Sequence, residues 1–89
     1  MPGAPYGPKE LAADLRWLME HQPVDKEALG DWYARTHEVK LRIEAAPESF
    51  PIPIGVWRWM NDADMRLSTP WYDQMCTRML VDALRELEN

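Results

Sequence analysis

A helical spacing of apolar residues follows the proline- and glycine-rich start of the chain. The stripe comprises Leu11, Ala12, Leu15, Leu18 and Met19. Pro8 suits a first helical position and Gln22-Pro23 ends the pattern, so the spacing predicts a helix over residues 8–22. Trp17 lies off the stripe, roughly 150° from its centre at about 100° per residue. We therefore expect this indole outside the buried face.

A second stripe predicts a long helix over residues 25–46, with Asp25 as its N-cap. Its members recur at alternating steps of three and four: Leu29, Trp32, Thr36, Val39 and Ile43. Only Leu41 falls off the stripe. Two acid-before-base pairs, Asp31 with Arg35 and Glu38 with Arg42, have the i,i+4 spacing that supports an exposed helix.

A β-hairpin over residues 38–58 is the alternative for this part of the chain. Residues 39–44 also alternate with period two, and a second alternating run follows the turn signal at 46–49; it consists of Phe50, Ile52, Ile54 and Val56. We favour the helix, because Leu, Lys, Arg, Glu and Ala are good helix formers and the helical register explains five positions.

Three prolines, Pro47, Pro51 and Pro53, keep residues 47–53 extended, and we expect Phe50 and Ile52 to hold this loop against the core. A short helix over 54–61 and a polar stretch over 61–64 follow. Ser68-Thr69-Pro70 then predicts the start of a helix over 70–88. The apolar face of that helix holds Tyr72, Met75, Cys76, Met79, Leu80, Ala83, Leu84 and Leu87.

These elements predict an all-α fold, a small bundle of three to four helices, with an α-β-β-α arrangement as the alternative. Residues 1–7 are expected to form a flexible arm rich in proline and glycine, and residues 8–89 a single helical domain. Apolar residues make up 46% of the 89 residues, including five tryptophans. A chain of this length is therefore expected to have a rich core and a surplus of large apolar side chains.

The charge balance argues against a partner made of nucleic acid. Ten Lys and Arg residues against fifteen Asp and Glu residues give a net charge of −5. Binding nucleic acid normally requires a basic face that displaces counterions. No apolar run approaches the roughly 20 residues that span a bilayer, so we expect no membrane partner either.

Cys76 is the only cysteine, which excludes an intramolecular disulfide and favours a reducing compartment. Residues 1–8 lack the basic and apolar regions of a signal peptide. We therefore expect the protein in the cytoplasm.

Two near-matches to metal-binding motifs fail at named positions. His37-Glu38 begins like the zinc-peptidase helix, but Leu41 stands where the second histidine is needed, and His21 and Cys76 have no paired spacing with it.

The second near-match is a calcium loop. Asp62, Asp64 and Asp73 match three of its positions, but Arg66 and Leu67 replace a ligand and the essential glycine. We therefore expect no metal, no cofactor and no enzymatic activity.

Trp57, Arg58 and Trp59 combine two indoles with a guanidinium, the residue types enriched at protein–protein hot spots. The alternative is that they pack in the core. With Trp17 they predict a partner-binding surface of a non-catalytic interaction domain, one expected to self-associate as a homodimer.

Two other functional hypotheses stay open. The acidic charge and small size are compatible with an inhibitor, of the phage or mobile-element type, that blocks the basic site of a nucleic-acid-processing protein. An enzyme or metal protein is the remaining and least favoured hypothesis.

Overall fold

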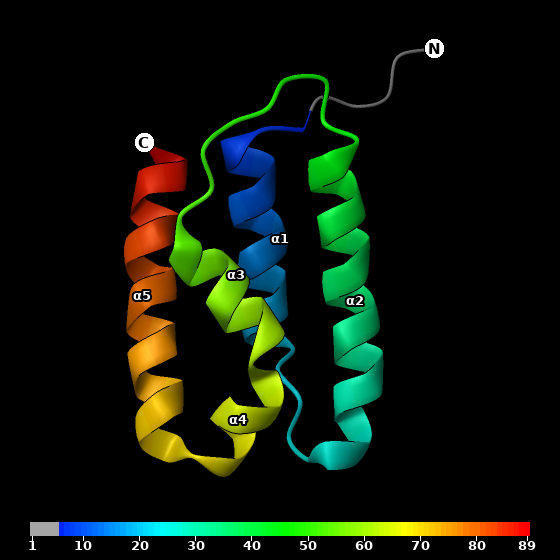
Figure 1. The fold of residues 1–89 in the computed structure, drawn as a ribbon, viewed down its shortest axis with the longest axis vertical. Helices are drawn as coiled ribbons and strands as arrows, with labels where there is room; N and C mark the ends of the chain where they lie inside the picture. The colour runs from blue at the N-terminus through cyan, green and yellow to red at the C-terminus, as the bar shows by residue number, and fades with distance from the viewer. Residues whose placement is uncertain (1–5) are drawn as a thin grey trace.

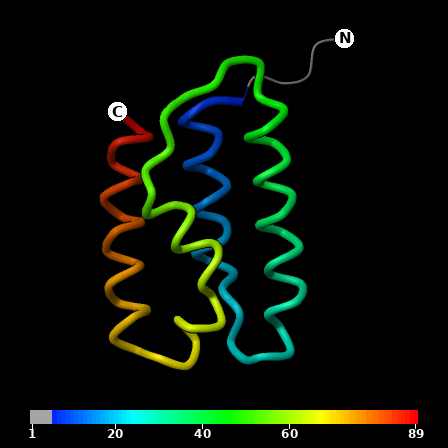
Figure 2. The backbone as a smooth tube through the Cα atoms, in the orientation of Figure 1, coloured from blue at the N-terminus to red at the C-terminus, as the bar shows by residue number. Residues whose placement is uncertain are grey.

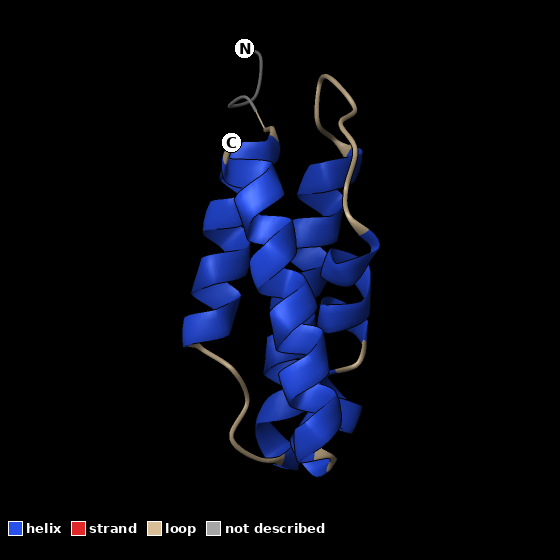
Figure 3. Cartoon of the chain, turned by 90° about the vertical axis from the view of Figure 1, so that its left-hand side faces the viewer, coloured by secondary structure: helices blue, strands red, loops and turns tan. Residues whose placement is uncertain are grey.

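In residues 6–89, three long helices run along the length of the molecule, and two short helices lie between them (Figure 1). The computed structural model describes residues 6–89. Its helices are α1 (Pro8–Glu20), α2 (Lys26–Glu44), α3 (Ile54–Asn61), α4 (Ala63–Ser68) and α5 (Pro70–Glu88). The all-α prediction is thus confirmed. The hairpin alternative is wrong, because residues 38–44 continue α2 and the described residues contain no strand (Figure 3).

The backbone trace shows an antiparallel arrangement (Figure 2). α1 and α2 run in opposite directions, the connection over residues 45–53 passes across the end of the bundle, and α3 and α4 lead back to the start of α5. α1 packs against both α2 and α5, while α3 and α4 pack most extensively against α5. The core therefore lies between the three long helices and the α3–α4 pair.

The predicted stripes are the buried faces of the long helices. From α1, Leu11, Ala12, Leu15 and Leu18 are buried. On α2 the register buries Trp32, Thr36 and Val39, whereas Leu41 is 49% exposed. The alternation of residues 39–44 was misleading because its apolar positions 39 and 43 also lie one helical turn apart. Phe50 and Ile52 pack against the core, as the proline-rich loop predicted.

Local hydrogen bonds explain where helices begin. The Asp25 carboxylate accepts from the backbone N–H of Ala28 at 2.9 Å, which confirms the predicted N-cap of α2. At the start of α1 the Gly7 amide donates to the Glu10 carboxylate at 2.9 Å. Thr69 occupies the N-cap of α5 but makes no side-chain cap bond there. The first two helices of the structure end at Glu20 and Glu44, so each is shorter than its predicted range of 8–22 or 25–46 by about a turn or less.

Helix α4 was not predicted, because the polar stretch over 61–64 indicated a linker at its start. Its buried residues are Ala63 and Arg66, neither of which marks an apolar stripe. Arg66 is buried because it stacks on Trp59 of α3 and on Trp32 of α2, and Trp32 is distant from it in sequence. Of the predicted arm, residues 1–5 lie outside the described residues. The Tyr6 hydroxyl donates to Asp14 at 2.8 Å.

Across residues 6–89, no helix combines the length and the apolar character that crossing a membrane requires.

Candidate functional site

Trp17 lies at the edge of a groove between α1 and α2. Its side chain is 43% exposed, as its position off the α1 stripe predicted. The indole stacks on the His21 imidazole with ring centroids 3.9 Å apart, and the Arg35 guanidinium carbon lies 5.6 Å from the indole centroid. His21 Nδ1 lies 2.7 Å from the Trp17 carbonyl oxygen. The ring is therefore held in one orientation while much of it stays in contact with water.

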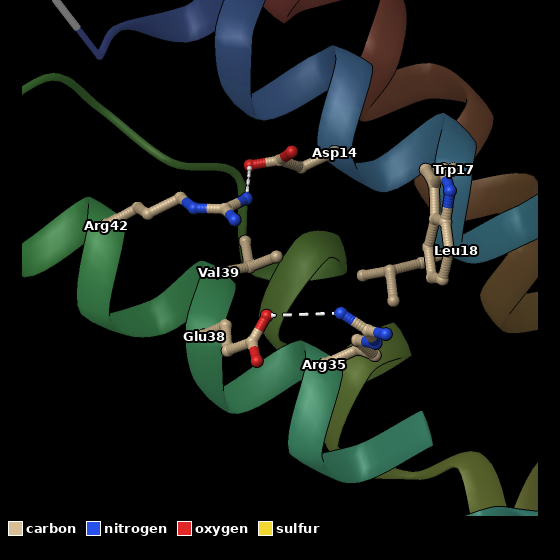
Figure 4. Close-up of a pocket in the computed structure, with 7 residues that line it drawn as sticks. All are labelled: Asp14, Trp17, Leu18, Arg35, Glu38, Val39 and Arg42. Carbon is tan, nitrogen blue, oxygen red and sulfur yellow. Dashed lines mark hydrogen bonds and ion pairs between the residues drawn. The ribbon is translucent and has the colours of Figure 1, made fainter. Parts of the chain in front are cut away.

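The groove itself has an apolar floor and a charged rim (Figure 4). Its volume is about 280 Å³. Leu18 of α1 and Val39 of α2 form the floor between the helices, with Trp17 at one end. We name this surface the Trp17 groove; it is lined by Asp14, Trp17, Leu18, Arg35, Glu38, Val39 and Arg42.

Two ion pairs arrange the charges on the rim of the Trp17 groove. Arg42 Nη1 lies 3.1 Å from the Asp14 carboxylate across the two helices, and Arg35 Nη1 lies 3.6 Å from the Glu38 carboxylate within α2. The i,i+4 pairs expected from the sequence are replaced by these contacts, because α1 supplies Arg42 with a nearer carboxylate.

Burial, together with the hydrogen bond to Asp14, raises the pKa of Tyr6.

The rim therefore carries two cations and two anions around an apolar floor. The chain as a whole has a net charge of −5, so the groove is locally neutral on an acidic molecule. Exposed ion pairs add little stability. They can, however, match opposite charges on a second surface.

The segment 57–59 divides between core and surface. Trp59 is fully buried, with its ring 5.2 Å from that of Trp32 at an angle of 71°. Trp57 is partly buried against the core, and Arg58 is exposed on α3. Two residues two positions apart on a helix point in nearly opposite directions, so the two indoles cannot both point to the centre of the core, and Trp57 packs only at its edge. Trp59 therefore acts in packing, while Trp57 and Arg58 stay predicted partner contacts.

Other large apolar side chains are exposed that the sequence analysis did not select. Trp71 is 68% exposed at the start of α5, and Met75, which was placed on the buried face, is exposed one turn further along. The exposure of Trp71 could have been predicted from the sequence, since this residue lies off the α5 stripe as Trp17 lies off that of α1. Met75 lies at the margin of a stripe whose centre is at Leu80 and Ala83, and margins become exposed where no helix covers them.

The aspartates of the calcium-loop near-match hold helices together. The Tyr72 hydroxyl donates to the Asp62 carboxylate, and Tyr33 donates to that of Asp64 at 3.0 Å. The described residues contain no group of three or more His, Cys, Asp or Glu side chains placed to hold a metal ion. Cys76 is buried in α5.

Comparison of the chain with protein-family models, with curated proteins and with solved structures found no match.

Proposed function

We propose that the protein is a non-catalytic interaction domain that self-associates through the Trp17 groove. The observation that carries this proposal is the exposed Trp17 indole, held in place at the end of an apolar groove. Tryptophan and arginine are the residue types most enriched at interface hot spots. An indole that is already oriented loses little conformational freedom on binding, which favours association.

The charge pattern on the rim favours a second copy of this chain as the occupant. In a two-fold symmetric interface the same patch meets itself, so every charge must find its opposite within the same patch. The Trp17 groove supplies Arg35 and Arg42 together with Asp14 and Glu38. Two acidic molecules repel each other at long range, and a neutral patch is where that repulsion is smallest.

The test is a measurement of mass in solution over a range of protein concentrations, by light scattering and sedimentation. The wild type should form dimers at micromolar concentration. Trp17→Ala should weaken the dimer by about 30-fold or more, the effect of losing a hot-spot residue worth at least about 2 kcal/mol. Its circular dichroism spectrum should not change, because the side chain lies outside the core.

Trp71→Ala is the matched control, since it removes an exposed indole from another helix. It should leave the dimer intact. A wild-type monomer at these concentrations would refute the proposal, as would a dimer that survives Trp17→Ala but not Trp71→Ala. A monomer that forms a salt-sensitive complex with a basic nucleic-acid-processing protein would instead favour the inhibitor hypothesis.

A further inference from the structure

His21 lies directly against the Trp17 indole, at the C-terminal end of α1. The two rings are stacked, with centroids 3.9 Å apart and an angle of 14° between their planes. His21 is itself exposed, and it lies beside the residues that line the Trp17 groove rather than among them. Histidine is the side chain that ordinarily changes its charge between about pH 5 and 8. A contact that buries Trp17 therefore also covers a group that can gain a charge.

The hydrogen bond of His21 shows which ring nitrogen takes up the proton. Nδ1 lies 2.7 Å from the Trp17 carbonyl oxygen, which can only accept a hydrogen bond, so Nδ1 carries a hydrogen and donates it. Nε2 is therefore the basic nitrogen. A proton on Nε2 leaves the hydrogen bond and the stack in place, because a positive charge is favourable on the face of an indole and at the C-terminal end of a helix. Protonation thus changes the charge of this surface and keeps its shape.

Within the described residues, both carboxylates that line the Trp17 groove already have an arginine partner (Figure 4). Asp14 pairs with Arg42 at 3.1 Å, and Glu38 pairs with Arg35 at 3.6 Å. The Arg35 guanidinium carbon also lies 5.6 Å from the centroid of the indole on which His21 stacks. A proton on His21 therefore adds a third cation to two cations and two anions. The surface changes from neutral to one net positive charge.

Glu20 of α1 and Asp31 of α2 are exposed carboxylates of the same two helices, and neither lines the groove. Glu20 already acts on another cation, because the pKa of Arg16 is raised first by its hydrogen bond to Glu88 and further by the charge of Glu20. Exposed charges are screened by salt over about 8–10 Å. These two carboxylates therefore offset a charge on His21 only in part.

From this geometry we infer that protonation of His21 dissociates the dimer, which makes self-association sensitive to pH. The inference rests on the proposed self-association through the Trp17 groove. In a two-fold contact each copy brings the same patch, so protonation places two like charges in one interface. Each imidazolium also gives up water when the contact covers it, which costs free energy unless a carboxylate compensates. The neutral ring meets neither cost.

The experiment measures the mass of the whole protein by sedimentation, at constant ionic strength, at about pH 8 and about pH 5.5. Aspartate and glutamate ordinarily titrate at about pH 4, so histidine accounts for most of the charge change between these two values. The dissociation constant of the wild-type dimer should be at least about tenfold higher at the lower pH, since each protonated copy must release a proton to enter the dimer. Helical circular dichroism should be the same at both values.

His37 provides a matched control, because it is the other histidine of the chain and is exposed on α2 outside the groove lining. His21→Gln cannot gain a charge, so its dimer should have the same dissociation constant at both pH values. His37→Gln should keep the wild-type dependence on pH. His21→Lys is charged at both values, and its dimer at about pH 8 should be as weak as that of the wild type at about pH 5.5.

Proton binding and association must affect each other equally, which provides a second measurement. Followed by NMR, the His21 ring should titrate at a lower pH in concentrated, dimeric protein than in dilute protein, whereas the His37 ring should titrate alike in both.

The outcomes separate this inference from the proposed function. A wild-type dimer that is equally tight at both pH values, that tightens at the lower one, or whose pH dependence survives His21→Gln would overturn the role of His21 and leave the groove as the contact. A wild type that is monomeric at both pH values would refute the proposed self-association, and the role of His21 with it.

Discussion

Replacing Gly55 with alanine should destabilise the protein, whereas the same replacement at Gly30 should stabilise it. Both glycines lie within helices, Gly55 in α3 and Gly30 in α2. A Cβ atom on Gly55 would lie 3.1 Å from Met79 Cβ and 3.2 Å from the Met79 carbonyl oxygen. Apart from its chain neighbours and the backbone of its own helix, a Cβ atom on Gly30 would have no atom within 4 Å. The two substitutions therefore differ in packing while their chemistry is the same.

The magnitudes follow from two opposing effects. Alanine is preferred over glycine within a helix by about 1 kcal/mol, which at Gly30 acts alone. At Gly55 the new methyl group meets the backbone of α5, which cannot rotate away, and overpacking of this kind costs about 1–3 kcal/mol. The net effect at Gly55 is a loss of up to about 2 kcal/mol, so the variants should differ by about 1–3 kcal/mol.

Thermal and urea unfolding of the two variants beside the wild type would measure this difference. Since 1 kcal/mol shifts the Tm of a domain of this size by about 4–8 °C, Gly30→Ala should melt several degrees higher and Gly55→Ala lower than the wild type. A Gly55→Ala protein that gains as much stability as Gly30→Ala would refute the close approach of α3 to α5 on which the reasoning rests.

Two further predictions concern capping and pH. Asp25→Ala should lower the free energy of unfolding by about 1 kcal/mol and Thr69→Ala by clearly less, because only Asp25 accepts a cap hydrogen bond; equal losses in urea titrations would contradict this. Burial raises the pKa of Tyr6 and Tyr33, and the hydrogen bond to Asp62 raises that of Tyr72. The unfolded pKa of a tyrosine phenol is about 10. Where the folded pKa is higher, the phenol stabilises the folded state fully below about pH 10, and this stabilisation is lost as the pH rises toward the folded pKa. Phenolate absorbance should therefore rise only together with loss of helical circular dichroism. Phenolate formation near pH 10 with an unchanged helical signal would show that the tyrosines are not protected as the structure implies.

The long helices could be predicted because their buried faces are continuous in sequence. The stripe of α2 from Leu29 to Ile43 needs no knowledge of what covers it, and a helical register is the simplest pattern that explains it. Helix α4 could not be predicted in this way. Its buried anchor, Arg66, is a charged residue outside any apolar stripe. Its burial is made favourable by the indoles of Trp32 and Trp59 and by hydrogen bonds to Gln22 and Asp73, none of which the pattern of α4 indicates.

The sequence could predict the exposure of the indole on the candidate surface, but not the ion pairs around it. Trp17 lies off the α1 stripe, and that alone indicates exposure. The partner of Arg42 depends on how closely α1 and α2 approach, and Arg35 pairs within α2 at i,i+3, so a rule based on i,i+4 spacing within one helix selected the wrong carboxylates. Arg42 pairs instead with Asp14, a residue 28 positions earlier in the chain.

The two exposed indoles distinguish a closed dimer from an open chain of molecules. If the Trp17 groove contacts the same groove of a second copy, the assembly is complete at two copies. If the groove instead contacts the Trp71 surface of the next copy, one groove and one Trp71 surface stay unoccupied, and further copies can add to the chain. Charge favours the closed form, because the groove already contains both signs and because each added copy brings another net −5 to a growing assembly. The mass should therefore reach a plateau at two copies as the protein concentration rises. A mass that keeps rising, and that Trp71→Ala stops at the monomer, would indicate the open contact instead.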